Sequence, residues 1–489
     1  MTSGGGTPPA TTSSEHPRRR WIVLGVAALA QLMVVLDGTI VNIALPAAQL
    51  DLGMSDSDRS WVVTIYALVF GSLLLLGGRI ADFWGRKRSF ILGMAGFAAA
   101  SALGGFATTG EMLLLARGLQ GLFAALLAPA ALALLSVTFP SGPDRIKAFA
   151  VYGTVAGSGA AVGLLLGGVL TEFLSWHWCL LVNVPIAIIA IIAAVPLVPE
   201  SRADGDTRYD ILGALLVTAG LGSIVYGFSR AELGWDRGDT VGFLALGVLL
   251  MVAFVLWERR ASNPLLPLRV VVDRVRGGAF LVSVMVGAAL LGGLLYLTFH
   301  FQIVLGMTPL MSGLASLPMT AAIMVTAPLA ARFLPIIGPR ILMTVGPLMA
   351  AAGLLWFSRI TADGAYVTQV LPGQIMLGIG LALVFVPMQN LALAGIDARD
   401  SGVAGAALTA TQQVGGSIGI AVFTALYAAA VESSTSGSAG NPLPAFVDGY
   451  SVVFIAAAVG LIFAAVISFF LIRVPKSTFT VNPEAIHAG

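Results

Sequence analysis

The sequence predicts an all-α protein that crosses a membrane many times. Of its 489 residues, 57% are hydrophobic and only 10% are charged, whereas about a quarter of the residues in a soluble domain are charged. Apolar runs of about 20 residues recur along most of the chain, and each is long enough for a helix that crosses roughly 30 Å of hydrocarbon. This composition excludes an ordinary soluble enzyme, and nothing in it supports nucleic-acid binding.

Charged residues and turns that contain Gly or Pro divide the apolar runs into fourteen expected spans. The first six cover residues 21–48, 58–77, 88–107, 111–138, 146–174 and 178–198, and two more cover 209–229 and 240–257. The last six cover residues 277–305, 309–334, 340–358, 367–396, 401–431 and 447–472.

The positions of the basic residues indicate which end of each span faces the cytosol. With the N-terminus in the cytosol, the outer side receives Arg59, Arg230, Arg237 and Arg359, Arg117 lies within a span, and every other Lys and Arg falls on the cytosolic side. This asymmetry satisfies the positive-inside rule. We therefore expect both termini in the cytosol and the chain in the plasma membrane.

A weak internal repeat divides the chain. Residues 78–88 (GRIADFWGRKR) have a partial counterpart at 332–340, and aligning Gly85 with Gly338, 253 positions later, maps spans one to six onto nine to fourteen. Two related six-helix halves with a substrate site between them are common in secondary transporters. The expected parts are a disordered cytosolic tail (1–17), an N-terminal half (18–198), two inserted helices (199–260), a cytosolic amphipathic linker (261–276), a C-terminal half (277–475) and a second cytosolic tail (476–489).

Asp37 is a carboxylate within the apolar run that begins at Trp21. An acid at membrane depth costs several kcal/mol, so a chain that retains one usually pairs it, hydrates it or uses its titration. We therefore expect Asp37 to be the chemical centre of the protein.

Four stretches, taken together and in order, resemble the major facilitator superfamily, and in particular its fourteen-helix branch of drug:proton antiporters. They are residues 36–46 (LDGTIVNIALP), 78–88, 115–121 (LARGLQG) and the glycine-rich fifth span that continues into 175–178 (SWHW). The resemblance covers roughly residues 18–475. It implies two six-helix halves that alternate in access to the two sides, and a latch that joins the halves on the inner side, formed by Gly78, Arg79, Asp82, Gly85, Arg86 and Lys87.

Asp37 and Arg117 are expected at similar depths. Arg117 lies about 9 Å from the outer end of its span at 1.5 Å per residue, and Asp37 lies about 24 Å from the inner end of its own, roughly 6 Å from the outer edge of the hydrocarbon core. In a coupled site, Arg117 favours the charged form of Asp37, desolvation favours the neutral form, and the balance changes as the cavity opens to each side. A static ion pair that holds the two helices together is the alternative.

The fifth span carries six glycines, several of them four residues apart, so bare backbone lies on one face and lets another helix approach closely. These glycines are Gly153, Gly157, Gly159, Gly163, Gly167 and Gly168. The resemblance places this face between the halves and associates it with antiport, although Leu164 stands where relatives carry a proline. Ordinary packing of small residues is the alternative.

Uncharged polar residues are candidates for lining a cavity, with hydrogen bonding between helices as the alternative. They are Asn42, Tyr66, Gln120, Asn390, Gln412 and Gln413. Relatives that export dications carry extra acids in spans ten and thirteen. This chain has no acid there, so we expect neutral or singly charged cargo.

These observations predict a monomeric proton-coupled exporter of amphipathic organic molecules, with membrane lipids as its other partners. No cofactor is expected, because the chain has no Gly-x-x-x-x-Gly-Lys motif for a nucleotide, and its single cysteine and scattered histidines give no metal site. The energy source is then the proton gradient. Uptake or lipid transport by the same fold, or a membrane scaffold or sensor without transport, are the alternatives.

Overall fold

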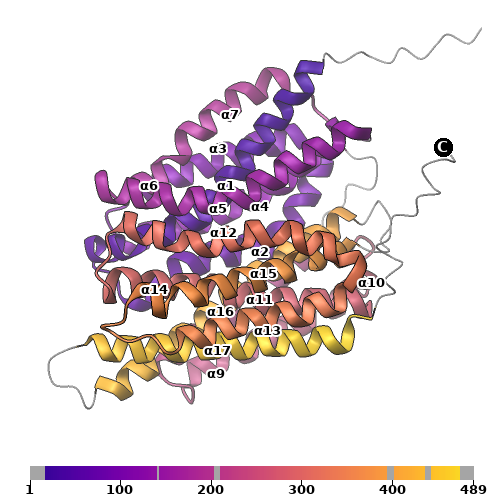
Figure 1. The fold of residues 1–489 in the computed structure, drawn as a ribbon. Helices are drawn as coiled ribbons and strands as arrows, with labels where there is room; N and C mark the ends of the chain where they lie inside the picture. The colour runs from indigo at the N-terminus through magenta and orange to yellow at the C-terminus, as the bar shows by residue number, and fades with distance from the viewer. Residues whose placement is uncertain (1–16, 140–141, 203–209, 394–400, 436–441, 474–489) are drawn as a thin grey trace, which may run out of the picture.

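The computed structural model describes residues 17–139, 142–202, 210–393, 401–435 and 442–473, and all regular structure in these ranges is helical. Within these ranges, thirteen helices are long and apolar enough to cross a membrane. The helices lie side by side with nearly parallel axes (Figure 1). The predicted all-α membrane fold is therefore confirmed. Of the expected tails at 1–17 and 476–489, all but Pro17 lies outside the described residues.

The N-terminal half contains seven helices, in which the expected sixth span is divided in two. They are α1 (Pro17–Leu52), α2 (Asp56–Trp84), α3 (Arg86–Gly105), α4 (Gly110–Thr138), α5 (Gly142–Phe173), α6 (Trp178–Leu181) and α7 (Asn183–Leu197). Helix α4 packs between α2 and α3, while α1 packs along α5 and also touches α4 and α7. The 20-residue α3 is not among the thirteen strongly apolar helices but lies within the bundle, and with it the arrangement has the fourteen helices expected.

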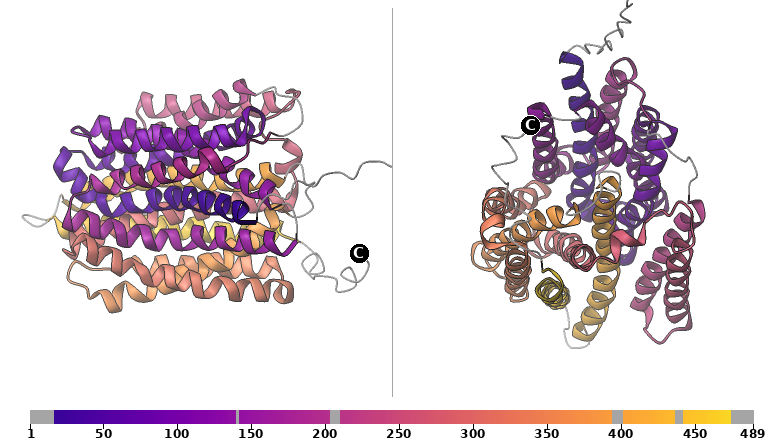
Figure 2. Two further views of the ribbon diagram at one scale, coloured as in Figure 1. Left: turned by 90° about the horizontal axis from the view of Figure 1, so that it is seen from above. Right: turned by 90° about the vertical axis from the view of Figure 1, so that its right-hand side faces the viewer.

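The two inserted helices form a hairpin of α8 (Ile211–Arg230) and α9 (Gly238–Glu258), joined through the short helix η1 (Ala231–Leu233). Helix α8 contacts α2 of one half and α16 of the other, and the hairpin stands apart from both halves in the end-on view (Figure 2). The expected amphipathic linker contains the short helix α10 (Leu268–Val271), and its last three residues begin the next helix. Pro264 and Pro267 disfavour a helix in the segment before α10. Leu265 and Val270 of this linker are 2% exposed, so it packs against the protein.

The C-terminal half repeats the pattern of the first. It contains α11 (Arg274–Phe299) with its π-helical end η2 (His300–Val304), α12 (Pro309–Ile337), α13 (Pro339–Phe357), α14 (Tyr366–Gln369), α15 (Leu371–Leu393), α16 (Ser401–Thr435) and α17 (Leu443–Leu471). Helix α15 packs between α12 and α13, and α11 packs along α16 and α17. The halves meet where α2 lies along α16 and α5 lies along α12.

Backbone geometry supports the internal repeat at three positions. Gly85 (φ 129°) and Gly338 (φ 91°) form equivalent turns in the two halves, and both adopt a positive φ that favours glycine. The same spacing of 253 residues relates Gly53 to Gly306, which have φ of 61° and 60°. It also relates two helix N-caps, Ser55 of α2 and Thr308 of α12.

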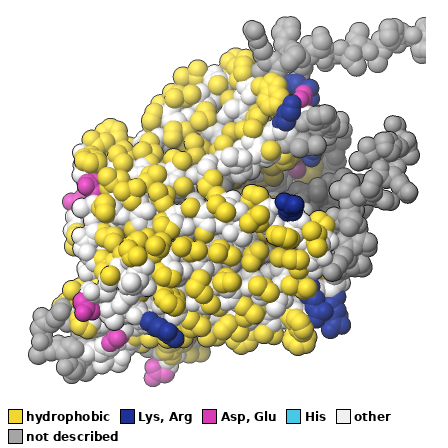
Figure 3. Space-filling model, viewed as in Figure 1, with side chains coloured by type: hydrophobic (Ala, Val, Ile, Leu, Met, Phe, Trp, Pro, Cys, Tyr) yellow, Lys and Arg dark blue, Asp and Glu magenta, His cyan; other side chains and the backbone are white. Residues whose placement is uncertain are grey.

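Charged side chains gather at the two ends of the helices, and a broad apolar band separates them (Figure 3). On the face shown, Lys and Arg lie mainly at the end where α1 begins and α17 ends, and Asp and Glu lie mainly at the other. This distribution matches the expected orientation, with the basic end in the cytosol. The chain is therefore a multi-pass membrane protein.

The two halves are joined at their outer ends. Gln302 of η2 donates a hydrogen bond to the carbonyl of Ile43 on α1 (2.9 Å), and Glu172 of α5 accepts one from the backbone N–H of Leu310 on α12 (3.0 Å). Arg59 was expected on the outer side, and it lies there in the first turn of α2, but it is only 2% exposed. It is buried because it lies between the halves, where Phe299 of α11 covers its guanidinium.

Candidate functional site

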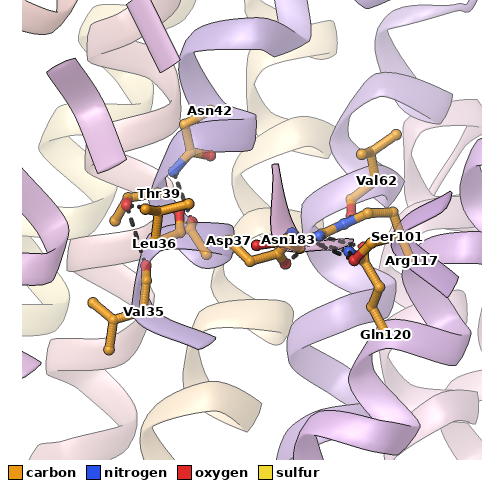
Figure 4. Close-up of polar contacts among 11 residues, drawn as sticks. Val35, Leu36, Asp37, Thr39, Asn42, Val62, Ser101, Arg117, Gln120 and Asn183 are labelled. Atoms are coloured by element: carbon orange, nitrogen blue, oxygen red, sulfur yellow. Dashed lines mark hydrogen bonds and ion pairs between the residues drawn. The ribbon is translucent and has the colours of Figure 1, made fainter. Parts of the chain in front are cut away.

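Asp37 lies in an unbroken stretch of α1 and points into the N-terminal half, toward α3, α4 and α7 (Figure 4). Its side chain is 0% exposed. The neighbouring side chains Leu36 and Ile40 are buried apolar groups, so the carboxylate depends on a few polar partners for its stability.

Three N–H donors surround the Asp37 carboxylate. Nη1 of Arg117 donates to Oδ2 at 2.6 Å, while Nε2 of Gln120 and Nδ2 of Asn183 each donate to Oδ1 at 2.9 Å. The predicted contact between Asp37 and Arg117 is therefore direct. Its predicted role in proton coupling remains a prediction.

The Arg117 guanidinium is also held by α2 and by its own helix. Its Nε donates to the Val62 carbonyl at 3.1 Å, its Nη1 donates to Oε1 of Gln120 at 2.8 Å, and it lies 4.3 Å from the centroid of the Tyr66 ring. A buried ion pair is tolerated only when such additional contacts replace water around both charges. With Arg117 1% exposed and Asp37 0% exposed, the pair is closed to water from both sides.

Ser101 and Asn183 complete the site. The Ser101 hydroxyl oxygen of α3 accepts from Nε2 of Gln120 (2.8 Å) and from Nδ2 of Asn183 (3.4 Å). Both residues are 0% exposed. Sequence reasoning missed them, because a single Ser or Asn in an apolar run carries no local signal of its partner. Asn183 is, however, the only amide between Cys179 and Val198, and a search for lone polar residues within spans would have selected it.

The candidate cavity residues have other roles in the structure. Asn42 (1% exposed) points away from Asp37 and donates to the Gly38 carbonyl of its own helix (Figure 4). Tyr66 and Gln120 are buried contacts of Arg117. In this conformation close helix packing inside the N-terminal half encloses these three residues, so their place along a cavity stays a prediction.

The other three cavity candidates lie in the C-terminal half. Asn390 of α15 is exposed and donates to the Val386 carbonyl of its own helix. Gln412 and Gln413 of α16 are partly exposed, and they lie where α16 packs against Gly287 of α11 and Gly71 of α2. These two glutamines remain candidates for lining a passage between the halves.

The glycines of α5 have two different neighbours, not one. Gly159, Gly163 and Gly167 pack against Val35, Thr39 and Ile40 of α1, within the N-terminal half. Gly168 alone among the described ones meets the other half, at Pro309 and Leu310 of α12. A Cβ on Gly153 would touch nothing, and the surroundings of Gly157 lie outside the described features. The prediction of one face between the halves is therefore wrong, because α5 passes α1 before it reaches α12.

The predicted latch residues make their contacts within the N-terminal half. Asp82 of α2 accepts from Arg86, the first residue of α3, with Nη2 at 2.9 Å from Oδ1. The ammonium of Lys87 donates to the Val195 carbonyl at 2.7 Å, and its backbone N–H donates to Glu200 at 3.2 Å. Gly85 provides the turn, and Gly78 lies against Pro129 of α4. The latch between the halves stays a prediction for a conformation in which the outer ends have separated.

The Asp37 carboxylate can take up a proton only if the protein changes its conformation. In this conformation the carboxylate has three donors and no exposure to water. Any proton that reaches Asp37 must come through an opening that this arrangement closes. Over the described residues, no cluster of three or more His, Cys, Asp and Glu could hold a metal ion.

Comparison with known sequences identifies one family. The family model of the Major Facilitator Superfamily matches residues 27–420. The chain is 47% identical to the puromycin resistance protein pur8 of Streptomyces alboniger over 93% of this chain and 92% of that protein. It is 36% identical to the cephamycin export protein CmcT of Amycolatopsis lactamdurans, over 95% of each chain.

Solved structures share the fold at low sequence identity. A bacterial homologue of the human lysosomal transporter Spinster, in an inward-facing and unoccupied conformation, has a TM-score of 0.65 and 15% identity, over 95% of this chain and 98% of that chain. The peptide transporter POT in complex with sulfate has a TM-score of 0.64 and 14% identity, over 93% and 94% of the two chains.

Proposed function

The chain belongs to the Major Facilitator Superfamily and is a membrane transporter of small molecules, and from this premise we propose that it exports amphipathic organic molecules, antibiotics among them, in exchange for protons. Two relatives that align along nearly the whole chain bear names of antibiotic resistance or export. These names support export over uptake, lipid transport or a scaffold without flux. We further propose that the protein works as a monomer and without a cofactor.

The observation that carries the proposal is the closed ion pair of Asp37 and Arg117, joined at 2.6 Å. Asp37 takes a proton from the outer side when the outer ends of the halves separate. The halves then rock, and Asp37 releases the proton inward as cargo is captured from the inner side. Because the carboxylate has no contact with water in the present conformation, proton movement and rocking are obliged to occur together.

The available energy fits such an exchange. One proton that enters across about 100 mV and one pH unit releases about 3.7 kcal/mol. For a neutral cargo and one proton per cycle, this energy sustains a gradient of several hundredfold, which is sufficient to lower the cytosolic level of an antibiotic.

The test uses purified protein in liposomes with an acidic interior and a clamped membrane potential. Ethidium is the probe, because its permanent single charge prevents passive trapping in an acidic lumen. We expect the pH gradient to drive ethidium uptake, puromycin to inhibit it, and Asp37→Asn to reduce it at least a hundredfold. The matched control is Asp51→Asn, the same change on the same helix at an exposed position. Full gradient-driven uptake by Asp37→Asn would refute the proposal and favour a static ion pair.

Cargo charge is tested in the same liposomes. The described parts of α12 and of the membrane-embedded region of α16 contain no acid that could accompany a second positive charge. Propidium, a bivalent analogue of ethidium, should therefore be transported at less than about a tenth of the ethidium rate, since a second unpaired charge is costly at membrane depth. Equal rates for the two dyes would contradict this part of the proposal.

A further inference from the structure

Asn183 has a buried oxygen that lacks a partner. The residue begins α7, its side chain is 0% exposed, and its Nδ2 donates to Oδ1 of Asp37 at 2.9 Å. Its own Oδ1 makes no hydrogen bond. Buried polar atoms in native proteins nearly always have a partner, so an exception at the centre of a site calls for an explanation.

The groups around Asp37 suit only the charged form of its side chain. Arg117, Gln120 and Asn183 all present N–H groups to the carboxylate. A carboxylate only accepts hydrogen bonds, whereas a protonated carboxyl also has an O–H group that must find an acceptor. Proton uptake by Asp37 therefore requires one of its neighbours to present a hydrogen-bond acceptor in place of an N–H donor.

The two other nearby oxygens are already in use. Oε1 of Gln120 accepts from Arg117 at 2.8 Å, and the Ser101 hydroxyl oxygen accepts from Gln120 and Asn183 at 2.8 and 3.4 Å. Oδ1 of Asn183 differs from both because it has no hydrogen bond of its own. It belongs to the same amide whose nitrogen contacts the carboxylate.

Resting on the proposed proton exchange, we infer that Asn183 is a positioning residue whose side-chain amide turns over when Asp37 binds a proton. A proton from water adds to Oδ1 of Asp37, and the bonds from Nδ2 of Asn183 to that oxygen and to the Ser101 hydroxyl break. Half a turn about the Cβ–Cγ bond then brings Oδ1 of Asn183 to accept from the new O–H. Arg117 keeps its contact with Oδ2 of Asp37, and Gln120 keeps its contacts with Oδ1 of Asp37 and with Ser101.

The Asn183 amide has an atom without a hydrogen-bond partner both before and after the turn. With Asp37 charged, the oxygen of Asn183 has no partner, and after the turn an N–H takes that position. The terminal torsion of Asn is broad and roughly two-fold, so the turn meets no strong rotamer preference. The charge on Asp37 decides the orientation once the protein has opened and a proton has reached the carboxylate.

Infrared difference spectra of the purified full-length protein, low pH minus high pH, test the turn when asparagine amides are isotope-labelled. We expect a carboxylic acid band that is lost in Asp37→Asn, together with an asparagine amide band that is lost in both Asp37→Asn and Asn183→Leu. Asn42→Leu is the matched control. Asn42 is 1% exposed and its Oδ1 also lacks a partner, but its Nδ2 bonds to Gly38, so this variant should keep the band.

Transport gives a second readout in liposomes with ethidium as the probe. We expect Asn183→Leu to reduce gradient-driven uptake at least tenfold more than it reduces ethidium exchange at equal pH, because only the driven cycle passes through protonated Asp37. Asn183→Thr, whose hydroxyl both donates and accepts, should recover part of the driven uptake. An equal loss in both assays, with no recovery by Thr, would overturn the inference and indicate a merely structural role.

Two outcomes separate this inference from the proposed function. A carboxylic acid band of Asp37 with no asparagine band in the labelled wild type overturns the inference and leaves proton exchange intact, even if Asn183→Leu fails to fold. Full driven uptake by Asp37→Asn overturns the proposed function itself.

Discussion

The guanidinium of Arg59 on α2 lies 3.7 Å from the centroid of the Phe299 ring on α11, and this contact joins the outer ends of the two halves. Arg59 is held in place by Gln49, whose Oε1 accepts from Nη1 at 2.6 Å, and by Asp56 at 3.3 Å. All of these polar partners belong to the N-terminal half. The cation–π contact is therefore a reversible connection, because the halves can separate without breaking an ion pair.

Replacing Arg59 with Ala should favour separation of the outer ends. Loss of a cation–π contact of about 1–2 kcal/mol shifts a two-state equilibrium roughly five- to thirtyfold. Distances between spin labels on Leu50 and Val367, both exposed at the outer ends, should gain a longer population in a Cys179→Ser background. Arg230→Ala, which removes a pair within the inserted hairpin, is the control and should leave the distribution unchanged. An unchanged distance distribution in Arg59→Ala would exclude a role of Arg59 in closing the outer ends of the halves.

Removing one partner of the buried Asp37–Arg117 pair should lower the free energy of unfolding more than removing both charges. Arg117→Leu leaves Asp37 as an uncompensated buried charge, and we expect a loss of about 3–5 kcal/mol in the free energy of unfolding. Adding Asp37→Asn removes that charge and should recover part of the loss. Denaturant unfolding of the two single variants and the double variant in detergent measures this coupling. Strictly additive losses would show that the two side chains do not depend on each other.

Two glycines of α5 should respond in opposite ways to the same change. A Cβ on Gly168 would lie 2.7 Å from the Cα of Leu310, so Gly168→Ala must displace the backbone of α12. A Cβ on Gly153 meets nothing, and Gly153→Ala should stabilise the helix by about 0.5–1 kcal/mol. The spin-label distances at the outer ends should change in Gly168→Ala and remain in Gly153→Ala. The same response in both variants would contradict the contact of α5 with α12.

Asp82→Asn should reduce transport while leaving the stability of the protein nearly unchanged. The ion pair with Arg86 joins the end of α2 to the start of α3 and is partly exposed, and such pairs contribute only about 0.2–1 kcal/mol. The unfolding midpoint should therefore fall by no more than about 2 °C, while ethidium transport should fall several-fold if Asp82 also serves the predicted latch. Asp363→Asn, at an exposed outer position, is the control. Unchanged transport in Asp82→Asn would reject the latch.

The main features of the fold could be predicted because each follows from a property that one segment carries alone. A run such as residues 240–257 is long and apolar enough to span a bilayer whatever its neighbours are. The alignment of Gly85 with Gly338 predicted the repeat, and the equivalent turns at Gly53 and Gly306 follow the same spacing. Depth along a helix also follows from residue counts, which is why Asp37 and Arg117 could be matched.

The face that each helix turns toward its neighbours was harder to predict. Spans in a membrane are apolar on nearly every side, so hydrophobic periodicity does not identify the face that turns inward. The glycines of α5 were therefore assigned to the wrong neighbour, and the hydrogen bond of Asn42 within α1 was not foreseen. Arg59 was placed on the correct side, but its position at a helix end gave no sign that Phe299, 240 residues later, covers it.

Hydrophobic length, the distribution of basic residues and helical rise are sufficient to predict fourteen membrane-spanning helices in two related halves, and one carboxylate at the depth of one buried arginine. The completion of the polar site of Asp37 by Ser101, Gln120 and Asn183, from three different helices, could not be predicted in this way. Hydrogen bonds between helices depend on packing across the bundle, which brings together residues up to 146 positions apart.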